Sequence, residues 1–172
     1  PEAAKYYQSF INQGFKHHRV FLNYGIILKN LGKFQEAEIY TLKAIEIKPD
    51  FAEAYLNLAN ISKNFGKLQQ AEVSLHKAIE IKPDLAEAHS NLGYLFKALG
   101  KLQQAEVSLR KAIEIKPDYA NAYYNLGNIL IDLGKLQEAE VSFRKAIEIK
   151  SDYAEAYYNL GNILRILGKL EE

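Results

Sequence analysis

The sequence predicts an all-α protein, a solenoid of stacked antiparallel helix hairpins, and two observations carry that prediction. The motif Lys-Ala-Ile-Glu-Ile-Lys occurs at 43–48, 77–82, 111–116 and 145–150, with each copy starting 34 residues after the last. A Gly-Lys pair recurs at the same interval, beginning at Gly32, Gly66, Gly100, Gly134 and Gly168. A period in the range of roughly 20–50 residues is typical of repeat proteins, in which each unit buries its apolar face against its neighbours.

The first half of each repeat predicts a helix with one buried face. In residues 52–65, Tyr55, Leu58 and Ala59 recur at the spacing of one helical face. Gly66 follows and predicts the end of this helix, because glycine adopts the positive φ that a tight turn after a helix requires.

The second half of each repeat predicts another helix. In residues 68–81 the apolar side chains fall on one stripe, formed by Leu68, Ala71, Leu75, Ala78, Ile79 and Ile81. Pro83 then ends the helix, because proline lacks a backbone N–H and disfavours helical geometry in the residue before it. Each repeat is therefore expected to be helix, turn, helix, turn.

This register predicts a single solenoid over residues 1–172 with about ten helices. A partial repeat at 1–17 supplies one second helix. Full repeats follow at 18–51, 52–85, 86–119 and 120–153, and the partial repeat at 154–172 supplies one first helix.

Within this register the chain resembles the tetratricopeptide repeat (TPR) family over its whole length. The family's pattern of aromatic, small and apolar positions is met by Tyr123, Leu126, Gly127, Ala139 and Phe143, and one repeat earlier by His89, Leu92, Gly93, Phe96, Ala105, Leu109 and Pro117. The departures are Ser62 and Leu130 in place of the second aromatic residue and Ser151 in place of proline.

The resemblance implies a right-handed superhelix whose first helices line a concave groove. It also implies a non-enzymatic scaffold for protein–protein interaction that binds an extended peptide or partner segment, without a cofactor. The identity of that protein ligand is not encoded in any motif.

Two columns of polar residues follow the first helices on the side away from the packing stripe. The first column is Asn23, Asn57, Asn91, Asn125 and Asn159, and the second is Ile26, Asn60, Tyr94, Asn128 and Asn162. A carboxamide both donates and accepts hydrogen bonds, so such columns suit an extended peptide backbone. Asn-Leu-Gly-Asn at 125–128 and 159–162 resembles the Asn ladder of the O-linked N-acetylglucosamine transferase groove and of bacterial TPR proteins. Local bonds between repeats are the alternative role for these side chains.

Further candidates for peptide binding flank these columns. Tyr124 and Tyr158 offer large contact areas, with packing against neighbouring side chains as the alternative. One turn further along the helices lie Lys29, Lys63, Lys97, Ile131 and Arg165. The lysine and arginine positions that family members use to clamp a C-terminal carboxylate are not basic here, so no strong preference for such an end is expected.

Composition narrows the classes of function. The net charge of +1 argues against nucleic acid or an anionic membrane as partner. There is no cysteine, and His17-His18 has no further ligands at metal-binding spacing, so no metal site is expected. Without a signal or membrane-spanning segment, a cytoplasmic location is expected.

Two alternative functions fit the same sequence. The chain reads as a fragment of a longer protein, so it could be the substrate-recruiting arm of an enzyme such as a glycosyltransferase. It could also assemble head to tail, with the helix at 1–13 of one copy docking on the helix at 154–167 of another and forming an open superhelix.

Overall fold

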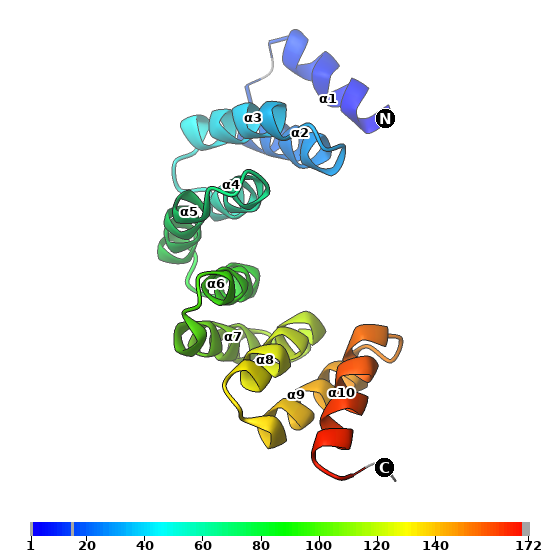
Figure 1. Ribbon diagram of the computed structural model, residues 1–172. Helices are drawn as coiled ribbons and strands as arrows, with labels where there is room; N and C mark the ends of the chain where they lie inside the picture. Colours follow the sequence, from blue (N-terminus) through cyan, green and yellow to red (C-terminus); the bar gives the residue numbers. More distant parts are fainter. Residues whose placement is uncertain (1, 15, 170–172) are drawn as a thin grey trace. The chain divides into compact units, whose positions relative to one another are not determined.

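The computed structural model describes residues 2–14 and 16–169, and this part of the chain forms ten helices and no strand (Figure 1). The prediction of an all-α fold of stacked antiparallel helix hairpins, with about ten helices, is confirmed for this part of the chain. The helices are α1 (Glu2–Asn12), α2 (His18–Asn30), α3 (Phe34–Ile47), α4 (Ala52–Asn64), α5 (Leu68–Ile81), α6 (Ala86–Ala98), α7 (Leu102–Ile115), α8 (Ala120–Asp132), α9 (Leu136–Ile149) and α10 (Ala154–Ile166).

The helices group into two compact units, Pro1–Pro83 and Asp84–Glu172. In the N-terminal unit, α2 pairs with α3 and α4 with α5, while α1 packs on α2 and α3 packs on α4. In the C-terminal unit, α6 pairs with α7 and α8 with α9, while α7 packs on α8 and α10 on α9. Each unit is thus a stack of antiparallel hairpins.

The turn inside each hairpin is closed by a glycine in the left-handed region. Gly66 has a φ of 70°, and its N–H donates to the carbonyl of Lys63 at 3.0 Å. The N–H of Lys67 donates to the carbonyl of Ser62 at 2.9 Å. Together these bonds satisfy carbonyls that the end of α4 would leave without a partner. Both bonds lie at the Gly-Lys step that recurs every 34 residues.

The end of each second helix does not depend on proline alone. The helices α5 and α7 end at Ile81 and Ile115, two residues before a proline. The helix α9 ends at the equivalent Ile149, although Ser151 stands where the other repeats have proline. The shared Ile-Lys-X-Asp ending therefore stops the helix even where the ring is missing.

Small residues let the two helices of a hairpin approach closely. A Cβ built on Gly127 of α8 would lie 2.6 Å from the ring of Phe143 in α9. Phe143 is fully buried, together with Ala139 and Ala146 on the same face. The absence of a side chain at residue 127 is what leaves room for the ring.

Ion pairs join successive second helices on the outside of the C-terminal unit. The carboxylate of Glu106 in α7 lies 2.8 Å from Lys135, at the start of the next second helix, and 2.8 Å from Arg110 one turn away. The hydrogen bond from Lys135, supported by Arg110, lowers the pKa of Glu106. Arg110 also reaches Glu138 at 2.6 Å, and the arrangement at Glu106 recurs one repeat later at Glu140.

Two substitutions at the same repeat position test the close approach of the helices. Gly127→Ala should lower the free energy of unfolding by about 1–3 kcal/mol, because the new methyl group overlaps the buried ring of Phe143. Gly161→Ala should raise it by up to about 1 kcal/mol, since no atom lies within 4 Å of its Cβ and alanine favours the helix. Denaturant titration followed by circular dichroism measures both, and equal effects would contradict the packing described.

Candidate peptide-binding face

The first helices of the hairpins pack directly against one another within each unit. In the N-terminal unit α2 contacts α4, and in the C-terminal unit α6 contacts α8. We call the surface that α2 and α4, or α6, α8 and α10, present together the first-helix face. All the residues predicted to bind a peptide lie on these helices.

The first-helix face of the C-terminal unit holds a pocket of about 200 Å³ between α6 and α8. It is lined by Gly93, Tyr94, Lys97, Leu109, Tyr124, Asn125, Asn128 and Ile129. Four of the predicted residues therefore meet at one place: Lys97, Tyr124, Asn125 and Asn128. Tyr94 was not predicted as a binding residue, although it occupies the second column of polar residues, and the residue is 51% exposed.

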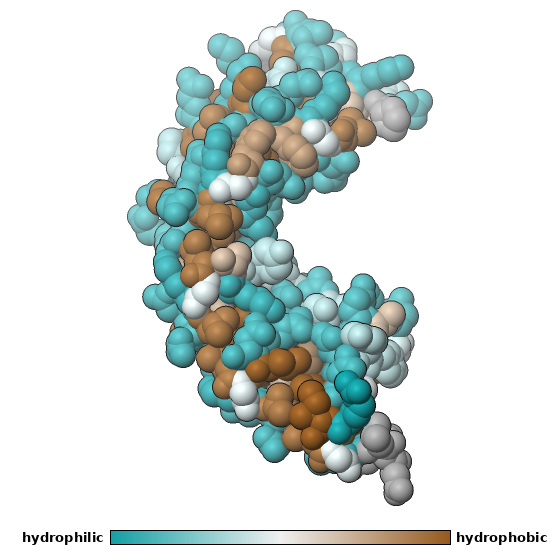
Figure 2. Space-filling view, in the orientation of Figure 1, coloured by the Kyte–Doolittle hydropathy of each residue, from teal (hydrophilic) through white to brown (hydrophobic). Residues whose placement is uncertain are grey.

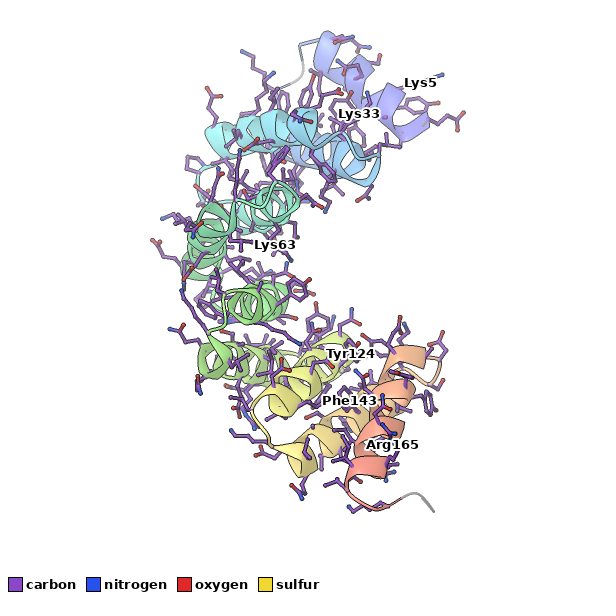
Figure 3. All side chains as sticks on the ribbon, in the orientation of Figure 1. Lys5, Lys33, Lys63, Tyr124, Phe143 and Arg165 are labelled. Carbon is purple, nitrogen blue, oxygen red and sulfur yellow. The ribbon has the colours of Figure 1, made fainter. Side chains whose placement is uncertain are left out.

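The side chain of Tyr124 packs against two other aromatic rings. Its ring centroid lies 5.9 Å from that of Phe143 in α9 and 5.0 Å from that of Tyr153, which precedes α10. Figure 3 labels both Tyr124 and Phe143. Burial, followed by the influence of Tyr124, raises the pKa of Tyr153 to about 12. Tyr124 thus has a fixed orientation while part of its ring stays accessible.

The cation at the edge of this pocket is paired. The ammonium of Lys97 lies 3.1 Å from the carboxylate of Asp132, at the end of α8. Both side chains are about 40% exposed, so the pair contributes less than about 1 kcal/mol to stability. Its main effect here is to cancel the positive charge beside the pocket.

Asn57 lies inside the N-terminal unit and joins two hairpins. The residue is only 4% exposed, and its Nδ2 donates to the hydroxyl of Thr41 at 2.8 Å. Thr41 in turn donates to the carbonyl of Ala37 at 2.7 Å. At this residue the first Asn column links α4 to α3.

The Asn residues of the C-terminal unit lie nearer the surface. Nδ2 of Asn159 in α10 donates to Oδ1 of Asn128 in α8 at 2.8 Å, so the two columns are bridged. This bond uses the acceptor of one carboxamide and the donor of the other, which leaves each side chain a second polar atom. Asn91, Asn125 and Asn162 are half-buried.

Two of the predicted residues on α10 are exposed. Tyr158 is 73% exposed, whereas Tyr124 in the same column is half-buried. Arg165 is also exposed and projects from α10 in Figure 3. The structure does not bring these two side chains into the pocket described above.

The first-helix face of the N-terminal unit carries two half-buried lysines. Burial lowers the pKa of Lys29. Burial, and then repulsion from Lys29, lowers the pKa of Lys63. Figure 3 labels Lys63 on α4, and Asn60 lies one turn before it on the same helix, also half-buried.

A second depression, of about 420 Å³, lies on the opposite side of α8, between α7 and α9. Its lining includes Tyr123, Leu126 and Leu130 of α8 and Val141 of α9, with Arg110 and Glu138 at its edge. Apolar surface gathers over α8 and α9 in Figure 2. The sequence did not predict this site. The signal that could have indicated it is an apolar residue at an exposed position of the second helices, such as Val141.

Among residues 2–14 and 16–169, no group of three or more His, Asp or Glu side chains is placed to hold a metal ion. None of the helices described for the chain has the length and apolar character that crossing a membrane requires.

The tandem hairpins and their polar first-helix face define a helical-repeat protein. The TPR repeat family model matches residues 66–100, 93–131 and 127–168, and two tetratricopeptide repeat models match residues 18–51 and 40–73. The chain belongs to the tetratricopeptide repeat family. Members of this family typically act as interaction scaffolds for proteins, and the fold is typically non-catalytic.

Solved structures of TPR proteins share the fold. A crystal structure of MamA is 28% identical in sequence, with 86% of each chain covered and a TM-score of 0.76. YrrB, described as a TPR protein with an unusual peptide-binding site, is 22% identical, with 98% of this chain and 87% of that chain covered and a TM-score of 0.75. PilF of Pseudomonas aeruginosa is 19% identical, with 88% and 69% covered and a TM-score of 0.84. No curated protein matches in a comparison of sequences.

The two environments within the first Asn column make a testable contrast. Asn57→Ala should lower the free energy of unfolding by about 1–2 kcal/mol, because it removes a buried hydrogen bond to Thr41. Asn125→Ala, at the same repeat position but half-buried, should change it by less than about 0.5 kcal/mol. Thermal and denaturant unfolding of both variants measures the difference, and equal losses would contradict a structural role specific to Asn57.

Proposed function

We propose that the chain binds an extended segment of a partner protein along its first-helix face, with the pocket between α6 and α8 taking one side chain of that segment. The observation that carries the proposal is the meeting of Tyr94, Tyr124, Asn125 and Asn128 around that pocket.

The pocket suits a single apolar or aromatic side chain. Its volume of about 200 Å³ is below the roughly 300–1,000 Å³ that is usual for sites of small-molecule ligands. Leu109 and Ile129 supply apolar lining, and the rings of Tyr94 and Tyr124 supply contact area with little rotamer freedom to lose. Tyr124 loses the least rotamer freedom on binding, because its ring already packs against Phe143 and Tyr153.

The carboxamides beside the pocket suit the backbone of the same segment. Asn125 and Asn128 lie on one face of α8, three residues apart, and each can both donate and accept. An extended peptide presents N–H and C=O groups in alternation, so it can pair with such side chains whatever its sequence. Side-chain selectivity would then come from the pocket.

The family and the fold support this proposal. TPR chains are typically scaffolds for protein partners, and YrrB shows that a chain of this fold has a described peptide-binding site. The proposal is the same whether the face acts alone or recruits substrates for an enzyme such as a glycosyltransferase, because both roles require the same binding step.

Binding can be measured with peptides selected against the 172-residue chain from a random display library. Asn125→Ala/Asn128→Ala should weaken the selected peptides by about tenfold or more in isothermal titration calorimetry, since each lost hydrogen bond contributes about 1 kcal/mol. The matched control Gln103→Ala/Gln137→Ala removes two exposed carboxamides from second helices and should leave affinity unchanged. Peptides that bind the first double variant as tightly as the unaltered chain would refute the proposal.

A second candidate function is head-to-tail association of copies of this chain. Among the described residues, Gly161 of α10 has no atom near its Cβ, whereas Gly127 meets a ring from its own second helix. At the other end, α1 exposes Tyr6 and Phe10, which are 68% and 48% accessible. The exposed apolar side chains of α1 are of a kind that could pack into the open space beside Gly161. This favours docking of α1 from one copy on α10 of another.

Analytical ultracentrifugation over a wide range of concentration tests this association. The unaltered chain should form species larger than a monomer, and Tyr6→Lys/Phe10→Lys should keep it monomeric. Val73→Lys/Val107→Lys, which changes two exposed residues of second helices, should associate as the unaltered chain does. A chain that stays monomeric at millimolar concentration would refute this second candidate.

A further inference from the structure

The pocket between α6 and α8 is walled by tyrosine rings from two different helices. Tyr94 comes from α6 and Tyr124 from α8, and these helices pack directly against each other within the C-terminal unit. Tyr94 is 51% exposed and Tyr124 is half-buried. Tyr158 stands at the repeat position of Tyr124 on α10 and is 73% exposed. The first helices α6, α8 and α10 therefore each carry a tyrosine ring with accessible surface on this face.

The polar side chains at the pocket favour a ligand that supplies acceptors. The oxygen of Asn128 accepts a hydrogen bond from Nδ2 of Asn159 at 2.8 Å, which takes an acceptor site of Asn128 and none of its N–H donors. The ammonium of Lys97, which also lines the pocket, has donors and no acceptor. A segment that offers carbonyl oxygens therefore suits this pocket better than one that offers N–H groups.

The charge and shape of the pocket favour a compact, uncharged group. Asp132 lies 3.1 Å from Lys97 and cancels the positive charge there. Leu109 and Ile129 contribute apolar surface beside the two tyrosine rings. A proline ring is apolar, uncharged and stiff, and its residue has a carbonyl but no N–H. Segments rich in proline adopt the polyproline II helix, whose carbonyls make no internal hydrogen bonds, and such segments dock in grooves lined by aromatic side chains.

The spacing of the first helices fits the repeat of a polyproline II helix. Every third residue of that helix faces the same side and lies about 9 Å further along, since the rise is about 3.1 Å per residue. The bond between Asn128 and Asn159 makes α8 and α10 neighbours, and packed helices lie about 8–10 Å apart. Two prolines separated by two residues can therefore reach the pocket beside Tyr124 and the ring of Tyr158.

We propose that the partner segment is proline-rich and binds as a polyproline II helix. One proline enters the pocket between Tyr94 and Tyr124, and the proline three residues away packs on Tyr158. The side-chain N–H groups of Asn128 donate to a carbonyl of the segment. This inference rests on the proposed function and adds the conformation and the residue class of the ligand.

The ligand class is tested with synthetic peptides that have acetylated and amidated ends, titrated into the 172-residue chain by isothermal titration calorimetry. The spaced peptide is Pro-Ser-Ala-Pro-Ser-Ala-Pro, and the clustered peptide of equal composition is Ser-Ala-Pro-Pro-Pro-Ser-Ala. The spaced peptide should bind about two- to tenfold more tightly, because only its prolines reach two tyrosine sites at once. A peptide with alanine in place of every proline should bind more weakly than both.

Variants of the chain test the two kinds of contact separately. Tyr94→Leu should weaken binding of the spaced peptide by about two- to tenfold, because a ring of the pocket wall is lost. The matched control Tyr157→Leu removes a tyrosine that is also 51% exposed but lies outside the pocket, and it should leave affinity unchanged.

Asn128→Asp tests the direction of the hydrogen bond. The carboxylate still accepts from Asn159 but has no N–H to donate, so the spaced peptide should bind about fivefold more weakly or worse. Gln103→Glu adds the same charge at an exposed position of α7 and should leave affinity unchanged. Circular dichroism melting curves that match the unaltered chain show that a loss of affinity does not come from unfolding.

The outcomes separate this inference from the proposed function. Equal binding of the spaced, clustered and proline-free peptides overturns the inference, as does binding of the spaced peptide that neither Tyr94→Leu nor Asn128→Asp weakens. If peptides selected from the display library still lose affinity for Asn125→Ala/Asn128→Ala, the proposed function then stands alone. If that sensitivity is absent as well, both fail.

Discussion

The whole structure depends on how closely the two helices of a hairpin can approach. A glycine of the first helix faces a larger buried side chain of the partner helix, as Gly127 faces the buried ring of Phe143. Gly93 faces Leu109 in the same way, and Gly25 faces Thr41. This contact fixes the register between first and second helix. The register then decides which side chains of the first helix are left to face outward.

The register explains why the sequence predicts helices well and side-chain environments less well. Helix ends follow from local chemistry: the glycine turn after α4 and the Ile-Lys-X-Asp ending of α5 both recur at a fixed interval, so the ten helices could be placed from the sequence. The role of Asn57 could not be predicted in this way, because it depends on a hydrogen bond to the hydroxyl of Thr41 from the preceding repeat. At the position of Thr41 other repeats have leucine or phenylalanine, which offer an Asn no acceptor.

Identical columns in the sequence therefore do not give identical sites. The carboxamide is a bridge between hairpins at Asn57, a link between helices α8 and α10 at Asn159, and part of a pocket wall at Asn125. Lys97 and Lys29 share a repeat position, but an Asp follows one and an Asn the other at the same distance. The second helices are nearly copies of one another, so the differences that could select a ligand are concentrated in the first helices and in what the neighbouring repeat places beside them.

The carboxylate of Glu106 has a consequence for how the C-terminal unit folds. It is held both by Arg110 of its own helix and by Lys135, at the first turn of the next second helix. The full set of bonds exists only when two successive repeats are folded together. The free energy of these bonds therefore stabilises the junction between the repeats rather than either repeat alone. Such junction terms determine whether a repeat array melts as one body or frays unit by unit. Because protonation of Glu106 removes its charge, this junction term is present above the ordinary carboxyl pKa and is lost as the pH falls through the lowered one, so acid makes the array less cooperative as well as less stable.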